Sequence, residues 1–151
     1  MVGRMKTKDR PLPRNEQAER TILGAILLDN KYFAQCDWLS PGDFSLDSHR
    51  LIFTSMSQML RGGLPVDYVT ILDWMDGAKY LSRIGETPRA YIASLTEGIP
   101  MNPAIKDYIR IVKEKAALRT IITACDLAID RAYDADPSRE IIAELKALSE
   151  V

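Results

Sequence analysis

Three aspartates are the residues whose type could support acid–base chemistry: Asp43, Asp47 and Asp67. Two carboxylates held close together can serve as a general acid and a general base. Each of these aspartates, however, lies where a turn closes or a helix is expected to begin, and there a side-chain oxygen accepts a hydrogen bond from a free backbone amide. The sequence therefore favours capping roles, and we predict no catalytic residue.

The single histidine and the two cysteines do not form a better candidate site. His49 lies one helical turn before Ile52 and Phe53, whereas Cys36 and Cys125 are far apart and form no C-x-x-C pair. A structural zinc ion needs about four ligands. We expect His49 to make a structural hydrogen bond, and we predict no metal and no cofactor.

The chain also lacks the motif that most often binds nucleotide phosphates. It contains no G-x-x-x-x-G-K-[ST] segment and no Gly-Lys dipeptide. That loop holds phosphates with its backbone amides and its lysine. We therefore predict that this chain is not an enzyme by itself.

The charge balance argues against a protein that binds nucleic acid on its own. The net charge is −1, with 46% hydrophobic and 27% charged residues. Phosphate binding needs clustered lysine and arginine, and the one cluster lies near the start of the chain: Arg4, Lys6, Lys8, Arg10 and Arg14. We expect residues 1–14 to form a flexible, solvated tail. The alternative is an arm that touches DNA, as in a small DNA-binding regulator.

Several features indicate the cellular location. A membrane-spanning helix needs about 18 or more apolar residues in a row, and no part of the sequence provides them. The start of the chain is charged and lacks the core of a signal peptide. Two distant cysteines fit a reducing compartment better than a disulfide framework. We expect a cytoplasmic protein without a membrane partner.

Short amphipathic segments separated by Gly and Pro predict a compact helical head at residues 15–98. Asn15 is a suitable N-cap for the first helix, and Gly24 within that helix typically allows a second helix to approach closely. No segment alternates with period two for long enough to predict a strand. The expected helices are 15–28, 31–39, 47–61, 67–75 and 88–98.

A much longer helix is expected after the head. No Pro or Gly interrupts the chain between Pro103 and Tyr133, and a helix of this length spans roughly 46 Å at about 1.5 Å per residue. The turn at 136–138 then starts a last, shorter helix. The predicted fold is all-α: a compact helical head at 15–98, followed by a long antiparallel helical hairpin at 99–151.

The long helix carries more apolar residues than its short partner can cover. Two stripes run along it, and each buried Ile or Leu stabilises by roughly 1.5–3 kcal/mol. We therefore predict that the chain associates with itself through the hairpin, the alternative being that the head covers both stripes. The predicted interface residues are Ile111, Leu118, Ile121, Ile122, Leu145 and Leu148.

The two tryptophans, Trp38 and Trp74, admit two interpretations. Core packing is the more general role of a large aromatic side chain, and anchoring a protein interface is the other. We expect both to pack in the core.

An ordered set of segments resembles the N-terminal domain of DnaB-family replicative DNA helicases. No single segment is specific, but their order and spacing together are. The segments are PRNEQAE at 13–19, LGAILLD at 23–29, LSPGDF at 39–44, HRLIF at 49–53, PVDYVTI at 65–71, YIASL at 91–95, YIRIVKEK at 108–115 and LR at 118–119.

The resemblance implies a non-catalytic assembly domain that acts in cytoplasmic DNA replication. In this family such domains pair through their hairpins, form a collar on a hexameric ring and dock the primase. The expected partners are thus a second copy (a dimer, or a hexameric ring) and primase, with DNA contacted only indirectly through a full-length helicase. Since the ATP-driven motor is absent from this sequence, the chain is expected to be either part of a longer helicase or a short relative that regulates one.

Overall fold

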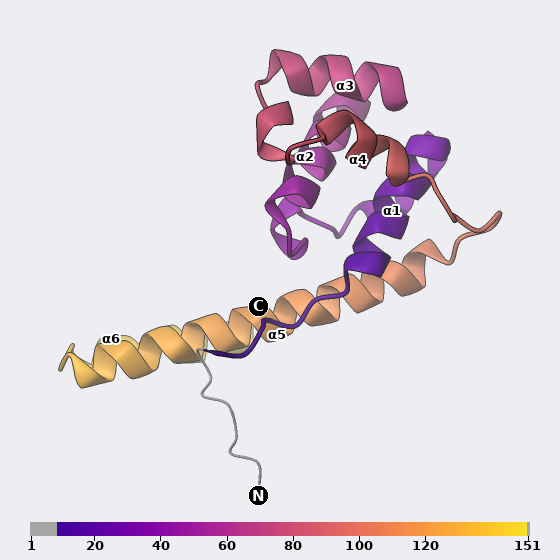
Figure 1. The fold of residues 1–151 in the computed structure, drawn as a ribbon. Coiled ribbons are helices and arrows are strands. Elements are labelled where there is room, and N and C mark those ends of the chain that lie inside the picture. Colours follow the sequence, from indigo (N-terminus) through magenta and orange to yellow (C-terminus); the bar gives the residue numbers. More distant parts are fainter. Residues whose placement is uncertain (1–8, 151) are drawn as a thin grey trace, which may run out of the picture. The chain divides into compact units, whose positions relative to one another are not determined.

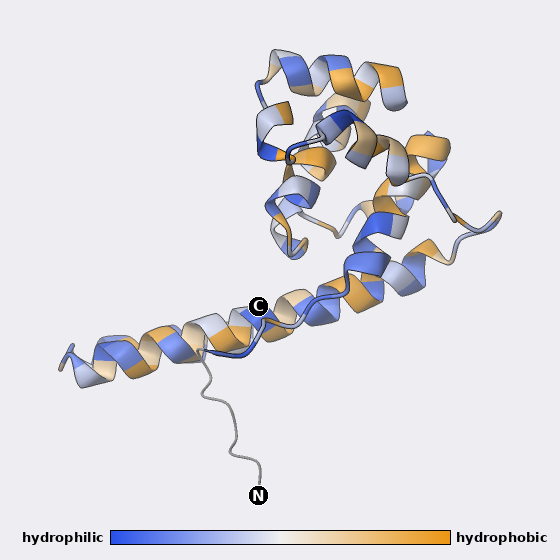
Figure 2. Ribbon diagram, viewed as in Figure 1, coloured by the Kyte–Doolittle hydropathy of each residue, from blue (hydrophilic) through white to orange (hydrophobic). Residues whose placement is uncertain are grey.

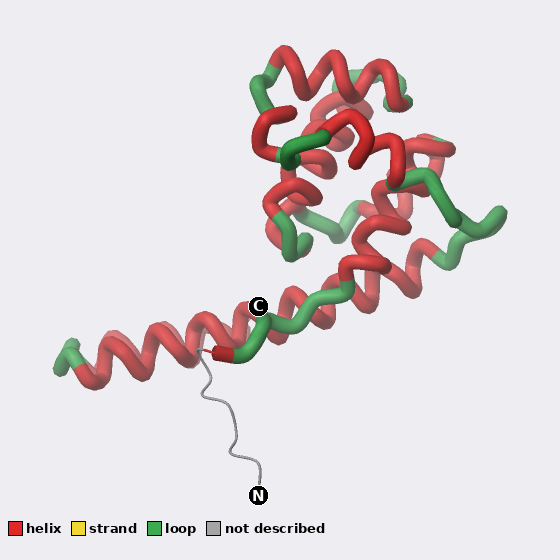
Figure 3. Tube along the Cα trace, in the orientation of Figure 1, coloured by secondary structure: helices red, strands yellow, loops and turns green. Residues whose placement is uncertain are grey.

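The computed structural model describes residues 9–150, and these residues form two compact units. The head unit comprises residues 14–116, and the hairpin unit comprises residues 117–150 together with 9–13. Residues 9–150 contain helices, turns and loops but no strand, as Figure 3 shows. The all-helical class predicted from the sequence is therefore confirmed.

The first helix, α1 (Glu16–Leu28), begins as the sequence predicts. The Asn15 side chain accepts a hydrogen bond from the backbone amide of Ala18 at 2.9 Å, which satisfies one of the free amides at the helix start. Apolar residues surround most of α1, and the helix is buried from Ile22 to Leu27. It lies in the core of the head unit (Figure 1).

The rest of the head consists of three α-helices and three 3₁₀ helices (Figure 1). In chain order these are η2 (Asn30–Cys36), η3 (Pro41–Asp43), α2 (Asp47–Arg61), α3 (Tyr68–Gly77), η4 (Leu81–Arg83) and α4 (Pro88–Ser94).

Two predicted helices differ from the structure. The segment expected as a helix at 31–39 is the 3₁₀ helix η2. The helix expected to reach residue 98 ends at Ser94, because the amides of Thr96 and Glu97 bond carbonyls three residues back, not four, and tighten the chain into turns.

Gly24 of α1 lies directly against the backbone of the residue that follows α4. A Cβ atom added to Gly24 would lie 1.9 Å from the carbonyl oxygen of Leu95, just after α4. Only glycine permits that approach, so the expectation that Gly24 admits a close neighbour is confirmed.

The long helix, α5 (Ile105–Tyr133), has 29 residues. Its first turns belong to the head unit, where Ile105, Ile109 and Val112 complete the core. These are its only buried residues within the described part of the chain. Figure 2 shows that hydrophobic residues nevertheless recur along the whole helix.

The hairpin unit contains the second half of α5, then α6 (Ser138–Ala147) and η5 (Leu148–Glu150). Arg131 of α5 forms ion pairs with Asp136 in the turn and with Glu140 and Glu144 of α6, so α6 runs back alongside α5. Hydrogen bonds to Asp136 and then Glu144 raise the pKa of Arg131 above its usual range. Ile141 is the buried residue of α6.

The predicted tail is described only in part. Residues 1–8, with Arg4, Lys6 and Lys8, lie outside the described residues. At the other end of the tail, the carbonyl of Pro13 accepts a hydrogen bond from Arg119 at 3.0 Å. Flexibility of residues 1–14 and the division of the chain between residues 98 and 99 stay predictions.

Candidate assembly and docking surfaces

The three aspartates have structural partners, which are local for Asp43 and Asp67 and distant in sequence for Asp47. The Asp43 carboxylate accepts a hydrogen bond from the Ser40 amide at 2.9 Å, and that of Asp67 accepts one from the Thr70 amide at 2.8 Å. Asp47 begins α2 and forms an ion pair with Arg83. The predicted capping roles of Asp43 and Asp67 are confirmed. The one predicted for Asp47 is wrong, because Leu46 is the N-cap residue of α2 and the Asp47 carboxylate pairs with Arg83.

His49 makes the structural hydrogen bond expected of it, but within a buried cluster that the sequence did not reveal. Its Nδ1 lies 2.9 Å from the Glu19 carboxylate, and its Nε2 hydrogen-bonds the Tyr91 hydroxyl. The backbone amide and hydroxyl of Ser45 also donate to Glu19. The cluster thus ties α1, α2 and α4 to the loop before α2.

The charge on Glu19 is stabilised inside the protein. Burial by itself would raise the pKa of Glu19, but hydrogen bonds from His49 and Ser45 outweigh burial and lower that pKa below its usual value. Burial raises the pKa of Tyr91. Glu19 is 1% exposed and His49 is fully buried, while Tyr91 is half-buried, so this cluster joins three helices of the head through buried polar contacts.

The two tryptophan side chains differ in burial. Trp74 is half-buried and packs against the core as predicted; its Nε1 is buried without a hydrogen-bond partner among residues 9–150. The prediction for Trp38 is wrong, because its side chain is 72% exposed. Cys36 and Leu39, on either side of it, take the two core positions at the end of η2, and burial raises the pKa of the Cys36 thiol to about 12.

The hairpin unit exposes an unusual amount of apolar surface. Of the five predicted interface residues in this unit, Ile121 and Leu145 are exposed, while Leu118, Ile122 and Leu148 are half-buried. Further exposed apolar residues outside the predicted set are Leu127, Ile129, Tyr133 and Ile142. The sixth predicted residue, Ile111, is exposed in the head unit.

Half-buried and exposed apolar residues follow one another along the second half of α5. Leu118, Ile122, Cys125, Ile129 and Tyr133 are spaced three or four residues apart, so they share one face. We call these five residues the α5 stripe. Ile121 lies at its edge, 51% exposed, and Ile129 within it is 53% exposed. An isolated exposed leucine is ordinary, but a continuous apolar row marks an interaction surface.

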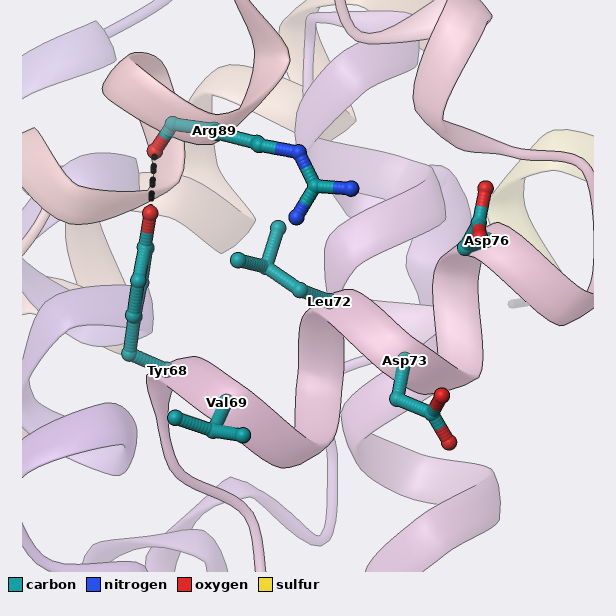
Figure 4. Close-up of a pocket in the computed structure, with 6 residues that line it drawn as sticks. All are labelled: Tyr68, Val69, Leu72, Asp73, Asp76 and Arg89. Atoms are coloured by element: carbon teal, nitrogen blue, oxygen red, sulfur yellow. Dashed lines mark hydrogen bonds between the residues drawn. The ribbon is translucent and has the colours of Figure 1, made fainter.

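A second apolar surface lies on the head, in a cleft between α3 and α4 (Figure 4). Tyr68, Val69 and Leu72 of α3 provide its apolar part, and Val69 is 71% exposed. The Tyr68 hydroxyl donates to the backbone carbonyl of Arg89 at 3.4 Å, and in Figure 4 the Arg89 guanidinium extends over Leu72. We call this the α3–α4 cleft; Asp73 and Asp76 complete its lining.

No three His, Cys, Asp or Glu side chains among residues 9–150 are placed to hold a metal ion. Within the same residues, none of the helices combines the length and hydropathy needed to cross a bilayer.

Comparison with known proteins identifies relatives along almost the whole chain. DnaB from Buchnera aphidicola subsp. Baizongia pistaciae, a replicative DNA helicase, is 35% identical over 143 residues, which are 91% of this chain and 30% of that protein. The replicative DNA helicase DnaB from Geobacillus stearothermophilus is 34% identical over 120 residues, covering 78% of this chain and 26% of that protein. The chain therefore spans less than a third of the length of these relatives.

Two solved structures share the fold. The crystal structure of the N-terminal domain of DnaB helicase from Mycobacterium tuberculosis superposes with a TM-score of 0.83 at 27% identity, covering 93% of this chain and 100% of that one. A DnaB-like replicative helicase, studied with its interactions with primase, gives a TM-score of 0.71 at 26% identity over 89% of this chain and 31% of that one.

The family assignment rests on sequence and fold together. The family model of the DnaB-like helicase N-terminal domain matches residues 11–114, well over half of the chain. The head and the start of α5 lie within that match, and the fold agrees over nearly the full length. This protein belongs to the family of DnaB-like helicase N-terminal domains.

Proposed function

We propose that this chain is the assembly and docking domain of a replicative DNA helicase in the cytoplasm. It performs no catalysis alone: it pairs with a second copy through the hairpin, the pairs build a hexameric collar, and the head docks primase. DNA is contacted only through the full-length helicase. The observation that carries the proposal is the exposed α5 stripe, supported by the relatives, which are replicative helicases.

Pairing follows from the free energy of burying apolar surface. Each apolar side chain that a partner covers contributes up to about 3 kcal/mol. The hairpin unit itself covers few of them, since Ile141, at 8% exposure, is its only buried apolar residue among those described. A second hairpin offers the same stripe, and self-complementary surfaces favour twofold dimers. The proposed interface includes the six residues predicted from the sequence: Ile111, Leu118, Ile121, Ile122, Leu145 and Leu148.

Primase docking is assigned to the α3–α4 cleft. One related structure is that of a DnaB-like replicative helicase and its interactions with primase. On the head of this chain, the cleft exposes apolar surface around Tyr68 and Val69. A primase helix or loop that inserts an apolar side chain over Leu72 would bury this surface.

Two variants test assembly and docking separately. Ile121→Asp combined with Ile129→Asp should reduce the sedimentation mass of the chain to that of a monomer with unchanged helicity by circular dichroism, because both side chains are exposed in the single chain. Val69→Asp should keep the mass of wild type and weaken primase binding at least about tenfold, or 1.4 kcal/mol.

Each variant is the control for the other. Wild-type mass for the Ile121 and Ile129 variant would contradict pairing through the hairpin. Undiminished primase binding by the Val69 variant would contradict docking in the α3–α4 cleft. A loss of helicity in the hairpin variant would show that these residues stabilise the single chain and would also contradict the proposed interface.

A further inference from the structure

The exposed Trp38 stands at the rim of a separate pocket on the head unit. Six side chains line it, from η2 and the loop after it and from the first turns of α5: Gln35, Trp38, Lys106, Ile109, Arg110 and Lys113. Its volume is about 270 Å³. Pockets for drug-sized ligands measure about 300–1,000 Å³, so this one suits a single bulky side chain better than a nucleotide.

The pocket combines an apolar interior with a basic rim. Ile109 is 3% exposed and lies in the core cluster, while the Trp38 side chain extends into solvent. Lys106, Arg110 and Lys113 are spaced four and three residues apart, which places them on one face of α5. No carboxylate is among the six lining residues, so the pocket carries three positive charges and no negative one.

The walls of the pocket are held in place. The Lys113 ammonium donates to the Trp38 carbonyl at 3.0 Å and to the Asp43 carboxylate at 3.2 Å, which fastens the loop after η2 and the end of η3 to α5. A site that is already formed loses little entropy when a ligand binds.

The other two cations are available to a ligand. Arg110 pairs with Asp107 at 2.8 Å, but both side chains are mostly exposed, and such pairs contribute only about 0–1 kcal/mol. Lys106 forms no ion pair with any of residues 9–150. The carboxylates of a ligand could therefore pair with Lys106 and Arg110 at little cost in free energy.

We propose that the Trp38 pocket docks an acidic peptide segment of a partner protein. One bulky apolar side chain of that segment fills the space between the Trp38 indole and Ile109, and flanking carboxylates pair with Lys106 and Arg110. Tryptophan and arginine are the side chains most enriched at the energetic centre of protein interfaces. This inference is independent of hairpin pairing and of docking in the α3–α4 cleft.

Single-stranded DNA is the competing ligand, since bases stack on exposed tryptophan beside basic side chains. The structure favours the peptide. Phosphate binding draws its free energy from many clustered cations, whereas this pocket is lined by only three and the chain has a net charge of −1. The pocket interior is also formed mainly by carbon atoms.

The test uses a short synthetic peptide in which aspartates flank a single phenylalanine, with a version carrying alanine in its place. Nuclear magnetic resonance titration should move the indole N–H signal of Trp38 and leave that of Trp74 in place. Lys106→Glu and Trp38→Ala should each weaken peptide binding at least about tenfold. Arg61→Glu makes the same charge change at the exposed end of α2, outside both the pocket and the α3–α4 cleft, and should alter affinity less than about twofold.

Three results would overturn the proposal. The first is an unmoved Trp38 signal at millimolar peptide. The second is equal binding of the alanine version, since the apolar side chain would then play no part. The third is tighter binding of a single-stranded oligonucleotide than of the peptide, if that binding is abolished by Trp38→Ala. The pocket would then be a stacking platform for DNA.

Discussion

Glu19 and His49 show how much of the head depends on two buried polar residues. A carboxylate with 1% exposure is tolerated because Ser45 and His49 bond it directly, with distances between 2.7 and 3.0 Å. Removing one partner would leave the other polar groups buried without compensation. Substitutions in this cluster are therefore expected to lower the stability of the head strongly.

Replacing the Glu19 carboxylate tests this at the residue scale. Glu19→Gln should lower the free energy of unfolding by about 2 kcal/mol at pH 7, because hydrogen bonds to a charged group contribute about 1.5–3 kcal/mol. The pKa of Glu19 is lowered in the folded protein. Its contribution is therefore complete above the ordinary carboxyl pKa and is lost as the pH falls through the lowered value.

Urea denaturation at several pH values measures the effect. The difference in unfolding free energy between wild type and Glu19→Gln should narrow as the pH falls below about 4. Glu16→Gln, in the exposed first turn of the same helix, should change stability by less than about 0.5 kcal/mol. A difference that grew on acidification would contradict the assigned role of Glu19.

Sequence reasoning at this scale succeeded where partners are local. Asn15 and Asp67 bond amides three residues away, so their roles follow from position alone. The Glu19–His49 contact joins residues 30 apart, and no local pattern marks it, because Glu19 stands among the polar residues of the first turns of α1. Trp38 was placed in the core wrongly, because the apolar pattern does not reveal that η2 ends just before it.

At the scale of elements, the approach of α1 to the end of α4 is the most restrictive contact. Gly24→Ala should destabilise the protein by about 2–3 kcal/mol, because the new methyl group would meet the Leu95 carbonyl, and backbone cannot move aside as a side chain can. Thermal unfolding should show a fall in Tm of about 5–10 °C.

Gly77→Ala is the matched control. Gly77 ends α3, and an added Cβ there meets nothing within 4 Å. The Tm of the Gly77→Ala variant should equal that of wild type or be slightly higher, since alanine restricts the unfolded chain more than glycine does. If both alanine variants unfolded at the wild-type temperature, the close packing at Gly24 would be disproved.

The elements themselves were largely predictable, and their ends were less so. The starts of α1, α2 and α3 follow from the residues that precede or open them, and the uninterrupted run after Pro103 predicts α5 to within two residues. The early end of α4 depends on turns at Thr96 and Glu97 that no breaker residue marks. The sequence thus predicts the location of the helices better than the residue at which a helix gives way to tighter turns.

At the scale of the whole molecule, the central feature is a helix whose apolar surface exceeds what the described chain covers. Ile105, Ile109 and Val112 fill the core of the head unit, but the α5 stripe lies in the hairpin unit with Ile129 and Tyr133 exposed. The excess was visible in the sequence, because residue counting alone shows that a short returning helix cannot cover a long one. Which residues remain exposed required the structure.

Sedimentation equilibrium of the wild-type chain over a range of concentrations tests the account most directly. Because association removes the α5 stripe from water, the account predicts a mass that rises with concentration to at least twice the 17.0 kDa of one chain. A mass that stays at 17.0 kDa up to the highest soluble concentration would contradict it.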